Sequence, residues 1–569
     1  MRIAVESGIM AKTIFGTSEK SNFILNMDLD HYRQGCGKLT LIVFWATAIA
    51  QLISHMLGSS EVKLAQIFEG GGFAGAVIFL LLLLRRVSLI FSLAGVFALF
   101  ATVIGLMRKQ FSKATAVPYL LTVASLVWAM ISRFHSYDLK ISLFGNPGRE
   151  EGWFALLMYG GIFYLGTMLR RKSDLERFGR GLMILGIAEC VVGFVQAIPL
   201  FDFLNPDDGL NPYRNIDPLL LWNTRLPAGM CSSPITYAMK LGMFGALAVP
   251  ASLLAEEKKT RVLGAVCMFC SIVMALKTQT IAGVIAAAGI LLTALILLVL
   301  KKQQAKSKAA AGLALCGAVC GVVWILLTPK INQTYFRPDK AHVQPGGKGF
   351  TVTAWEKDVS DITLPSGLTI AKSKDGNTYP ALYDGGIVWD DGFYRVSTAG
   401  SYYPSAEHDF EIYDAASVLR YCWKQGIKAI KIDPLLGVGP DNFPFTQMRT
   451  SLEITANANA VDNPYNEYLY IAATRGIPSL LMHLAMLVCC FVLVWKRRGI
   501  VQSWVRLAAC CAVALYAVTA LVGMSVLTVA PVFWALLGVM AAEPIAEKAA
   551  APKPEQTGKK SDKKEKANA

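Results

Sequence analysis

The chain has 569 residues, of which 54% are hydrophobic and only 17% are charged, against roughly 25% charged residues in an ordinary soluble domain. This composition excludes an ordinary soluble protein, because apolar runs of the roughly 20 residues that cross a bilayer recur between Leu39 and Met540. The formal net charge of +15 does not indicate nucleic-acid binding, because the Lys and Arg residues gather beside apolar runs without an aromatic-interleaved basic domain.

The first 38 residues are polar and contain no apolar core of a signal peptide. We therefore expect no cleavable signal peptide, and we expect residues 1–38 to be a cytoplasmic segment. The first span then serves as its own insertion signal.

Thirteen apolar runs are candidate membrane spans. They lie near 39–57, 68–84, 87–107, 116–132, 152–169, 180–200, 229–254, 261–278, 280–300, 309–328, 478–496, 503–523 and 526–545. Basic clusters at 170–172, 258–261, 301–308, 496–498 and in the carboxy-terminal tail alternate as cytoplasmic loops should. This alternation predicts that residues 133–151, 201–226 and 329–477 lie outside.

The amino-terminal third does not fit thirteen crossings. With a cytoplasmic tail, thirteen spans would place the basic amino terminus outside, whereas Lys and Arg favour the inside. Either one span between 68 and 107 is not a full crossing or one run is divided wrongly. We expect twelve crossings.

The predicted fold is an all-α polytopic membrane protein with a small β-rich insert outside the membrane. Residues 39–328 form spans with short loops, 329–477 form an extracytoplasmic region, and 478–545 form the last spans. Within the extracytoplasmic region, β-rich segments separated by Asp-Gly and Gly-Gly turns predict an insert at 349–402. Helical spacing of apolar residues from Ala415 to Lys431 predicts an amphipathic helix, within a motif region at 415–477. Residues 546–569 are expected to form a basic, disordered cytoplasmic tail.

The twelve cysteines do not predict a disulfide framework or a metal site. Nine of them lie inside apolar runs, where they act as small packing residues. Cys267 and Cys270 form a CxxC pair without a second pair nearby, so we expect no zinc site. Cys422 is the one cysteine of the extracytoplasmic region.

Several motifs in the extracytoplasmic segments resemble those of the O-antigen ligase and polymerase family of membrane glycosyltransferases. They are Arg420 with Trp423, DPLLGVGPDNF at 433–443, DNPYNEYL at 462–469 and Arg475 with Gly476, in the family's order and spacing. LFGNPGREEG at 143–152 resembles a motif of members from Gram-positive lineages. The resemblance covers most of the membrane region, but not residues 1–38, the β-rich insert or the tail.

The resemblance implies a metal-independent enzyme of the multi-span glycosyltransferase type, without a cofactor. Its members transfer a glycan from an undecaprenyl-diphosphate carrier to a saccharide, lipid or cell-wall acceptor at the outer face of the cytoplasmic membrane. The expected partners are therefore that donor, the acceptor and membrane lipids, and no nucleic acid. Polymerase and ligase activities stay open. The Gram-positive form of the motif at 143–152 favours a capsule or cell-wall polysaccharide over lipopolysaccharide.

A diphosphate leaving group requires cations, and arginine binds phosphate bidentately without titrating. Arg420 matches a family position that contacts the diphosphate, and Arg149 and Arg225 are further candidates. The alternative for Arg149 is a headgroup-level anchor. We also expect substrate contacts from side chains inside the matching motifs, namely Trp423, Asp441, Asn442 and Asn466.

An acceptor hydroxyl must lose a proton, and the family histidine for that role is replaced by Tyr465. A tyrosine with an ordinary pKa of about 10 is a poor base at neutral pH. Glu467 or Asp462 could act instead, with Tyr465 orienting the acceptor. Both carboxylates could equally be solvated charges of a loop and a helix start.

A second departure lies at Ile281, where family members commonly carry an arginine. Lys277 could supply the missing cation from the same helix face, or it could extend toward the membrane boundary as an amphipathic side chain. The two replaced positions motivate an alternative, a catalytically degenerate member that binds the lipid carrier or scaffolds polysaccharide assembly. A third class, a transporter, would require Glu189 and Lys240 to line a continuous water path.

Overall fold

The structure is a computed structural model that describes residues 28–57, 86–146, 149–197, 227–300, 304–327, 415–446, 463–497 and 503–545, with short strands between 340 and 411. The predicted span at 68–84 and the carboxy-terminal tail at 546–569 lie outside the described residues.

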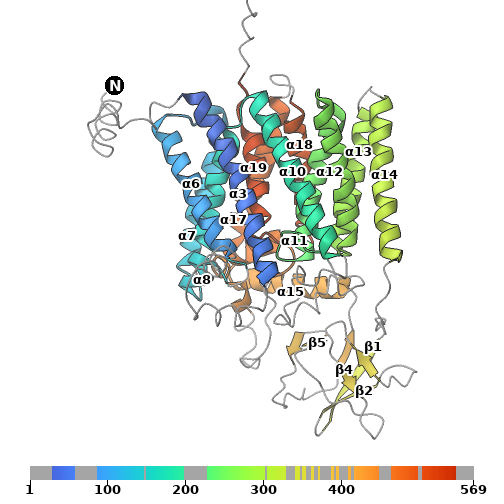
Figure 1. Cartoon of the computed structure of the whole chain (residues 1–569). Helices are drawn as coiled ribbons and strands as arrows, with labels where there is room; N and C mark the ends of the chain where they lie inside the picture. Colours follow the sequence, from blue (N-terminus) through green and yellow to red (C-terminus); the bar gives the residue numbers. More distant parts are fainter. Residues whose placement is uncertain are drawn as a thin grey trace, which may run out of the picture.

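The described residues form long helices that run side by side (Figure 1). They are α3 (Leu29–Leu57), α6 (Val87–Met107), α7 (Ala116–Arg133), α9 (Trp153–Thr167), α10 (Lys172–Gln196), α11 (Pro234–Leu254), α12 (Lys258–Lys277), α13 (Ile281–Leu300), α14 (Gln304–Leu327), α17 (Glu467–Lys496), α18 (Trp504–Thr519) and α19 (Ala530–Ala541). Nine helices in the described part are long and apolar enough to cross a membrane, and α9, α18 and α19 are shorter apolar helices. This confirms an all-α polytopic membrane protein, while the exact number of crossings stays a prediction.

The helices pack around α11 and α19, in which almost every side chain is buried. α11 packs on α12, α13 and α18, and α19 packs on α9, α17 and α18. The contact between α9 and α19 is close because glycine faces glycine: a Cβ at Gly166 would lie 2.3 Å from the carbonyl oxygen of Ala535, and one at Gly538 would lie 2.2 Å from that of Phe163. Small residues allow such close approach where lipid offers no hydrophobic driving force between helices.

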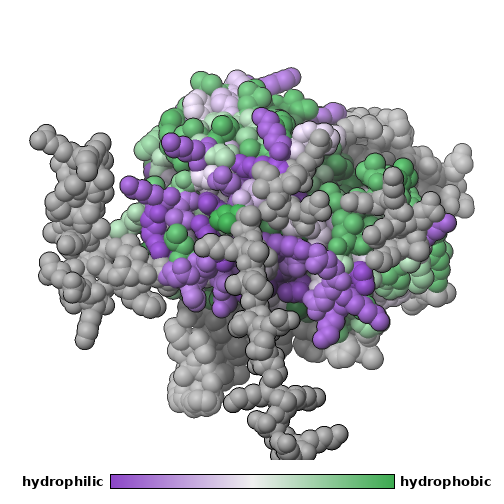
Figure 2. Space-filling view, turned by 90° about the horizontal axis from the view of Figure 1, so that it is seen from above, coloured by the Kyte–Doolittle hydropathy of each residue, from purple (hydrophilic) through white to green (hydrophobic). Residues whose placement is uncertain are grey.

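One end of the bundle, here called the basic end, carries exposed Lys109, Arg177, Lys258, Lys259 and Lys496. Figure 2 views this end and shows hydrophilic residues gathered across it, with hydrophobic residues at parts of its rim. Ion pairs tie the helix starts together here.

These pairs join Arg171 to Asp30 at 2.6 Å, Lys172 to Glu256 at 2.5 Å and Arg180 to Glu257 at 2.8 Å. They explain why two helices begin earlier than the hydropathy predicts: α3 begins at Leu29 rather than 39, and α10 at Lys172 rather than 180. Apolar runs mark only the part of a helix that contacts lipid, whereas the backbone hydrogen bonds continue through paired polar residues.

The opposite end, here called the site end, carries α8 (Leu139–Phe144) and the amphipathic helix α15 (Ala415–Ile432), which lies across the ends of the long helices (Figure 1). α15 packs on α17 and buries Cys422 and Ala429, while Lys424 and Lys428 are exposed. Ile427, predicted on the apolar face, is 46% exposed.

Short antiparallel strands precede α15 along the chain. They are β1 (Lys340–Gly346), β2 (Gly349–Thr353), β3 (Asp361–Thr363), β4 (Thr369–Ala371), β5 (Gly386–Trp389), β6 (Gly392–Arg395) and β7 (His408–Glu411). They pair in the order β2-β1-β7, β3-β4 and β5-β6, with Val343 opposite Val352 in the first sheet. The β-rich insert as a folded unit stays a prediction.

Candidate functional site

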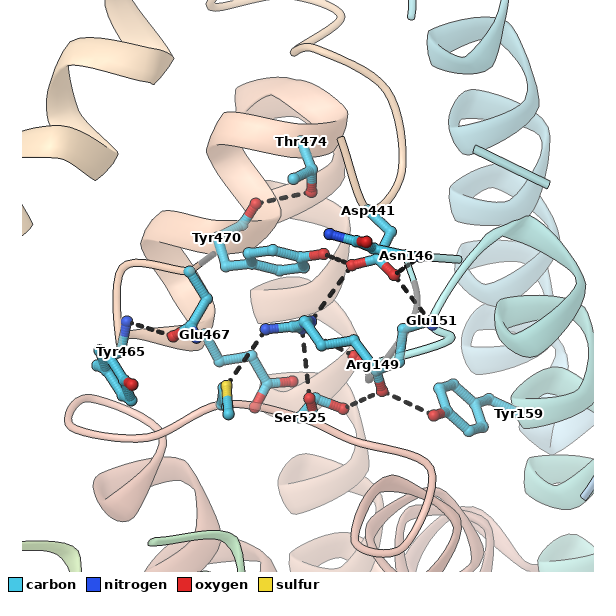
Figure 3. Close-up of polar contacts among 12 residues, drawn as sticks. Asn146, Arg149, Glu151, Tyr159, Asp441, Tyr465, Glu467, Tyr470, Thr474 and Ser525 are labelled. Atoms are coloured by element: carbon cyan, nitrogen blue, oxygen red, sulfur yellow. Dashed lines mark hydrogen bonds and ion pairs between the residues drawn. The ribbon is translucent and has the colours of Figure 1, made fainter. Parts of the chain in front are cut away.

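Four segments that are far apart in the sequence meet at the site end: residues 145–151, 433–446, 463–470 and 520–529. Figure 3 shows their polar side chains converging on Arg149. We name Arg149, Glu151, Tyr159, Asp441 and Tyr470 the Arg149 cluster.

Glycines shape the loop 433–446. Gly437 and Gly439 have φ of +69° and +95°, a region that favours glycine. A Cβ at Gly437 would lie 2.5 Å from the backbone of Thr474, and one at Gly439 would lie 2.2 Å from Ser136. These glycines form a tight turn, which packs between Ser136, just after α7, and Thr474 of α17.

Asp441, at the end of this turn, is 1% exposed and bridges two loops. Its Oδ2 accepts hydrogen bonds from the backbone N–H of Asn146 at 2.6 Å and of Glu151 at 3.2 Å. Its Oδ1 accepts from the Tyr470 hydroxyl at 2.5 Å and lies 3.2 Å from Nε of Arg149. Asp441 therefore joins the LFGNPGREEG segment to the DPLLGVGPDNF segment.

Asn442 is fully buried and connects the same turn to α8. Its Oδ1 accepts from the backbone N–H of Asp138 at 3.0 Å, and its Nδ2 donates to Ser142 Oγ at 2.7 Å and to the Pro440 carbonyl at 2.9 Å. All of these partners belong to the protein.

The guanidinium of Arg149 lies at the centre of the cluster, with its side chain 4% exposed. Nη2 donates to Glu151 Oε2 at 3.0 Å and to the Ser525 carbonyl at 3.3 Å, and the group stacks over the Tyr470 ring, 4.0 Å from its centroid. Its surroundings are those of a buried, paired charge rather than of a headgroup-level anchor.

Glu151, which was not among the predicted site residues, receives two further hydrogen bonds. The hydroxyls of Tyr159 and Ser525 donate to its Oε1 at 2.7 and 2.8 Å. Its place inside the LFGNPGREEG motif was the available sequence signal. Tyr159 in α9 and Ser525 in the loop before α19 belong to none of the motifs. Only the packing of distant segments brings them to Glu151.

The DNPYNEYL segment begins α17 beside the cluster. Asn466 caps the helix, its Oδ1 accepting from the N–H of Tyr468 and Leu469, both at 3.1 Å. Glu467 is 6% exposed, and its Oε2 accepts from the Tyr516 hydroxyl at 2.6 Å. α17 thus begins at Glu467, before the predicted span at 478–496, and non-helical backbone at Gly476 separates this first part of the helix from that span.

Tyr465 occupies a left-handed turn before this helix, with φ of +46°. The turn is held by Asn463, whose Oδ1 accepts from the N–H of Tyr465 at 2.8 Å. The Tyr465 ring is half-buried and lies at the edge of the group in Figure 3, away from Arg149.

Arg475 adds a second guanidinium. It belongs to one of the matching motifs but was not among the predicted site residues. It lies in α17 just before Gly476, where φ of +78° interrupts the helix. The half-buried side chain interacts electrostatically with Tyr470, Glu151 and Glu467. Within the described part of the chain its guanidinium makes neither a hydrogen bond nor an ion pair.

Lys277 lies apart from this group, at the end of α12. Its side chain is buried, and Nζ lies 5.0 Å from the centroid of the Trp324 ring in α14. Ile281 begins α13 after a turn in which the Thr280 hydroxyl accepts from the N–H of Gly283 at 2.9 Å. The lysine is therefore held within the helix bundle rather than extended to its edge.

The remaining predicted residues are only partly described. The backbone of Arg420 lies in α15, but its side chain is outside the described part, as are Asp462 and Arg225 altogether. Trp423 lies half-buried on α15, and its indole N–H is buried without an acceptor within the described residues.

Glu189 and Lys240 form a second buried pair, joined by a hydrogen bond from Nζ to Oε1. Both are almost fully buried, and Glu189 Oε2 also accepts from the N–H of Met230 at 2.7 Å. Neighbouring Cys231 is an uncharged packing residue, because burial raises the pKa of its thiol to about 12. The pair anchors the loop before α11, which does not favour the transporter alternative.

The fold and this site define a polytopic α-helical membrane protein with a polar, partly charged site at one end of its bundle. Residues 264–484 match a protein family described as O-antigen ligase. This match confirms the predicted resemblance to the O-antigen ligase family for that part of the chain. The match includes α13 to α15 and the loop 433–446 but neither Arg149 nor Ser525. No curated protein matches the chain.

Proposed function

We propose that this protein transfers or polymerises an undecaprenyl-diphosphate-linked oligosaccharide at the outer face of the cytoplasmic membrane, onto a glycan, lipid or cell-wall acceptor. The observation that carries the proposal is the convergence of three matching motifs, around Arg149, Asp441 and Glu467, at one end of the bundle. Membership in the O-antigen ligase family supports glycan transfer in the membrane.

The side of the membrane follows from charge. Lys and Arg are retained on the cytoplasmic side, so the basic end faces the cytoplasm and the site end faces out. A flippable polyprenyl carrier could then present its diphosphate to the site from the outer leaflet.

The diphosphate is assigned to Arg420 and Arg475 rather than to Arg149. Glu151 and Asp441 already neutralise the Arg149 guanidinium, so Arg149 acts as a positioning residue. Arg475 has no hydrogen bond or ion pair to its guanidinium among the described residues, and it interacts with the same cluster from α17, on which the helix of Arg420 packs. Two guanidinium groups suit a diphosphate, which gains negative charge as it leaves.

In this reaction an acceptor hydroxyl oxygen bonds to the anomeric carbon of the donor glycan. The bond from that carbon to the diphosphate oxygen breaks, undecaprenyl diphosphate leaves, and the hydroxyl proton passes to a base. Glu467 is the proposed base, because Tyr516 fixes Oε2 while Oε1 accepts no hydrogen bond within the described residues. Asp462 is the alternative, and Tyr465 would orient the acceptor.

The test is release of carrier diphosphate by the purified protein in nanodiscs, with a panel of undecaprenyl-diphosphate-linked oligosaccharides. Arg420→Ala and Arg475→Ala should each lower turnover about 10²- to 10³-fold, the range for removing one donor to a developing anion. Lys424→Ala, an exposed residue of the same helix as Arg420, is the matched control and should keep wild-type turnover. Full activity in both arginine variants would refute the site assignment.

A catalytically degenerate, carrier-binding protein is the second candidate, favoured by Tyr465 in place of the family histidine. Its signature would be saturable binding of the carrier lipid without diphosphate release from any donor of the panel. Arg420→Ala should then weaken binding itself.

A further inference from the structure

A second candidate site lies at the basic end, away from the proposed glycan site. Arg506 is in the first turn of α18 and is 6% exposed. Its Nε and Nη2 are buried and have no hydrogen-bond partner in the part of the chain that the structure describes.

These two donors form one edge of the guanidinium. Their N–H groups point in parallel, in the arrangement with which arginine binds both oxygens of a phosphate or carboxylate. Because both donors of this edge lack a partner, the guanidinium can still bind two oxygen atoms of one anion at once. Burial of a charge without a partner is strongly unfavourable.

Four carboxylates described at this end have partners other than Arg506. Glu256 pairs with Lys172, Glu257 with Arg180 and Asp30 with Arg171. Glu543 accepts a hydrogen bond from Ser112.

The surroundings add positive rather than negative charge. Arg497 interacts electrostatically with Arg506. Its own guanidinium is fixed by two backbone carbonyls, because Nη1 donates to Ala541 and Nη2 to Ala114, both at 2.6 Å. Among the described residues no carboxylate pairs with Arg506, so an external anion would complete its pairing.

The depth of the site indicates which anion. Arg506 begins α18 just after the loop that follows the exposed residues Trp495 and Lys496, which are typical of the membrane interface. Phosphates of the lipid headgroups lie at this level, and basic pockets between helices on the cytoplasmic side bind acidic headgroups.

We propose that Arg506, supported by Arg497, binds the phosphate group of an anionic phospholipid between α17 and α18 at the basic end. The shared chemistry is a phosphate oxyanion held bidentately by the Nε and Nη2 edge. A free phosphate ion could meet the same chemistry, and the test separates the two sources.

The experiment compares thermal unfolding of the full chain in phosphatidylcholine nanodiscs with and without phosphatidylglycerol. A ligand that binds only the folded state raises the unfolding temperature. The wild type should gain several degrees from phosphatidylglycerol, and Arg506→Gln should gain none. Arg177→Gln, an exposed arginine at the same end, should gain as much as the wild type.

The comparison does not depend on the absolute stability of the variant. In phosphatidylcholine alone, Arg506→Gln should unfold at the wild-type temperature or above it, because the substitution removes an unpaired buried charge. Arg506→Lys keeps the charge but loses the planar guanidinium donors. It should show part of the rise in unfolding temperature that phosphatidylglycerol gives the wild type.

Inorganic phosphate titrated in a neutral detergent forms the second arm. If phosphate, but not phosphatidylglycerol, raises the unfolding temperature in an Arg506-dependent way, the bound anion is free phosphate rather than a lipid headgroup. Native mass spectrometry of the wild type should show one retained phosphatidylglycerol, depleted at least tenfold in Arg506→Gln. Equal gains from either anion in the wild type and Arg506→Gln would overturn the proposal.

Discussion

The side chains of the Arg149 cluster form a closed network in which each charge has a named partner. Arg149 faces two carboxylates and an aromatic ring, and those carboxylates also accept from two backbone N–H groups and three hydroxyls. Such a network fixes loop positions within the protein.

Arg149→Met should destabilise the protein. The substitution leaves Glu151 and Asp441 buried without their cation, and breaking a buried pair from one side costs about 3–5 kcal/mol. A lower thermal unfolding temperature in detergent is the measurement. Lys140→Met, an exposed residue of neighbouring α8, should leave the temperature unchanged, and equal behaviour of the two variants would contradict the role of Arg149.

Tyr465→Phe should change glycan transfer less than about threefold if the ring only packs and orients the acceptor. The reason is that an ordinary tyrosine hydroxyl is a poor base at neutral pH. Turnover is the readout, with Lys424→Ala as the control. A loss of two orders of magnitude would give the hydroxyl a direct role in the reaction.

At the scale of elements, α17 links the site to the membrane. The DNPYNEYL motif leads into its first turn, and Arg475 lies just before the break at Gly476. The loop 433–446 packs at this break through a hydrogen bond from the Ile477 N–H to the Pro434 carbonyl at 2.8 Å. Gly437 and Gly439 form the turn of the same loop, so the glycines of both motifs allow this loop to pack closely against α17.

Gly476→Ala should lower the stability of the protein. A Cβ there would lie 1.9 Å from the Leu435 carbonyl oxygen, and φ of +78° strains any other residue by about 1–3 kcal/mol. Thermal unfolding should show the loss. Gly312→Ala in α14 is the matched control, because its Cβ would meet nothing within 4 Å, and it should be neutral or stabilising. A neutral Gly476→Ala would argue against this packing.

At the scale of the whole molecule, charge divides the bundle into two ends with different functions. The basic end carries exposed Lys109, Lys258, Lys259 and Lys496 and the proposed phosphate site of Arg506, and the site end carries α8, α15 and the Arg149 cluster. Apolar side chains such as Phe97 and Leu292 face outward between them.

This orientation predicts which end a membrane-impermeant maleimide reaches in intact cells. Lys431→Cys, on exposed α15, should be labelled without permeabilisation, and Lys258→Cys at the basic end should be labelled only after it. The unmodified protein reports the background from its native cysteines. The reverse pattern would invert the topology.

The sequence by itself determined the membrane class and most helices, because lipid demands about 20 apolar residues per crossing and leaves a periodic signal. It also carried the resemblance to the O-antigen ligase family, because the site motifs are contiguous strings. Hydropathy did not predict the helix starts at Leu29 and Lys172, because polar residues continue a helix beyond the lipid where ion pairs such as Arg171 with Asp30 hold them.

Only the tertiary structure decided which motif residues are engaged with one another. Asp441 and Asn442 were predicted to contact substrate, and the structure gives them protein partners in segments 290 or more positions away. Glu151, Tyr159, Ser525 and the open edge of Arg506 were likewise invisible, because a hydrogen bond depends on where two distant segments meet. Hydropathy and motifs are local properties of each segment, and they predict whether it lies in lipid or resembles a known site. The pairing of buried charges depends on which distant segments pack together.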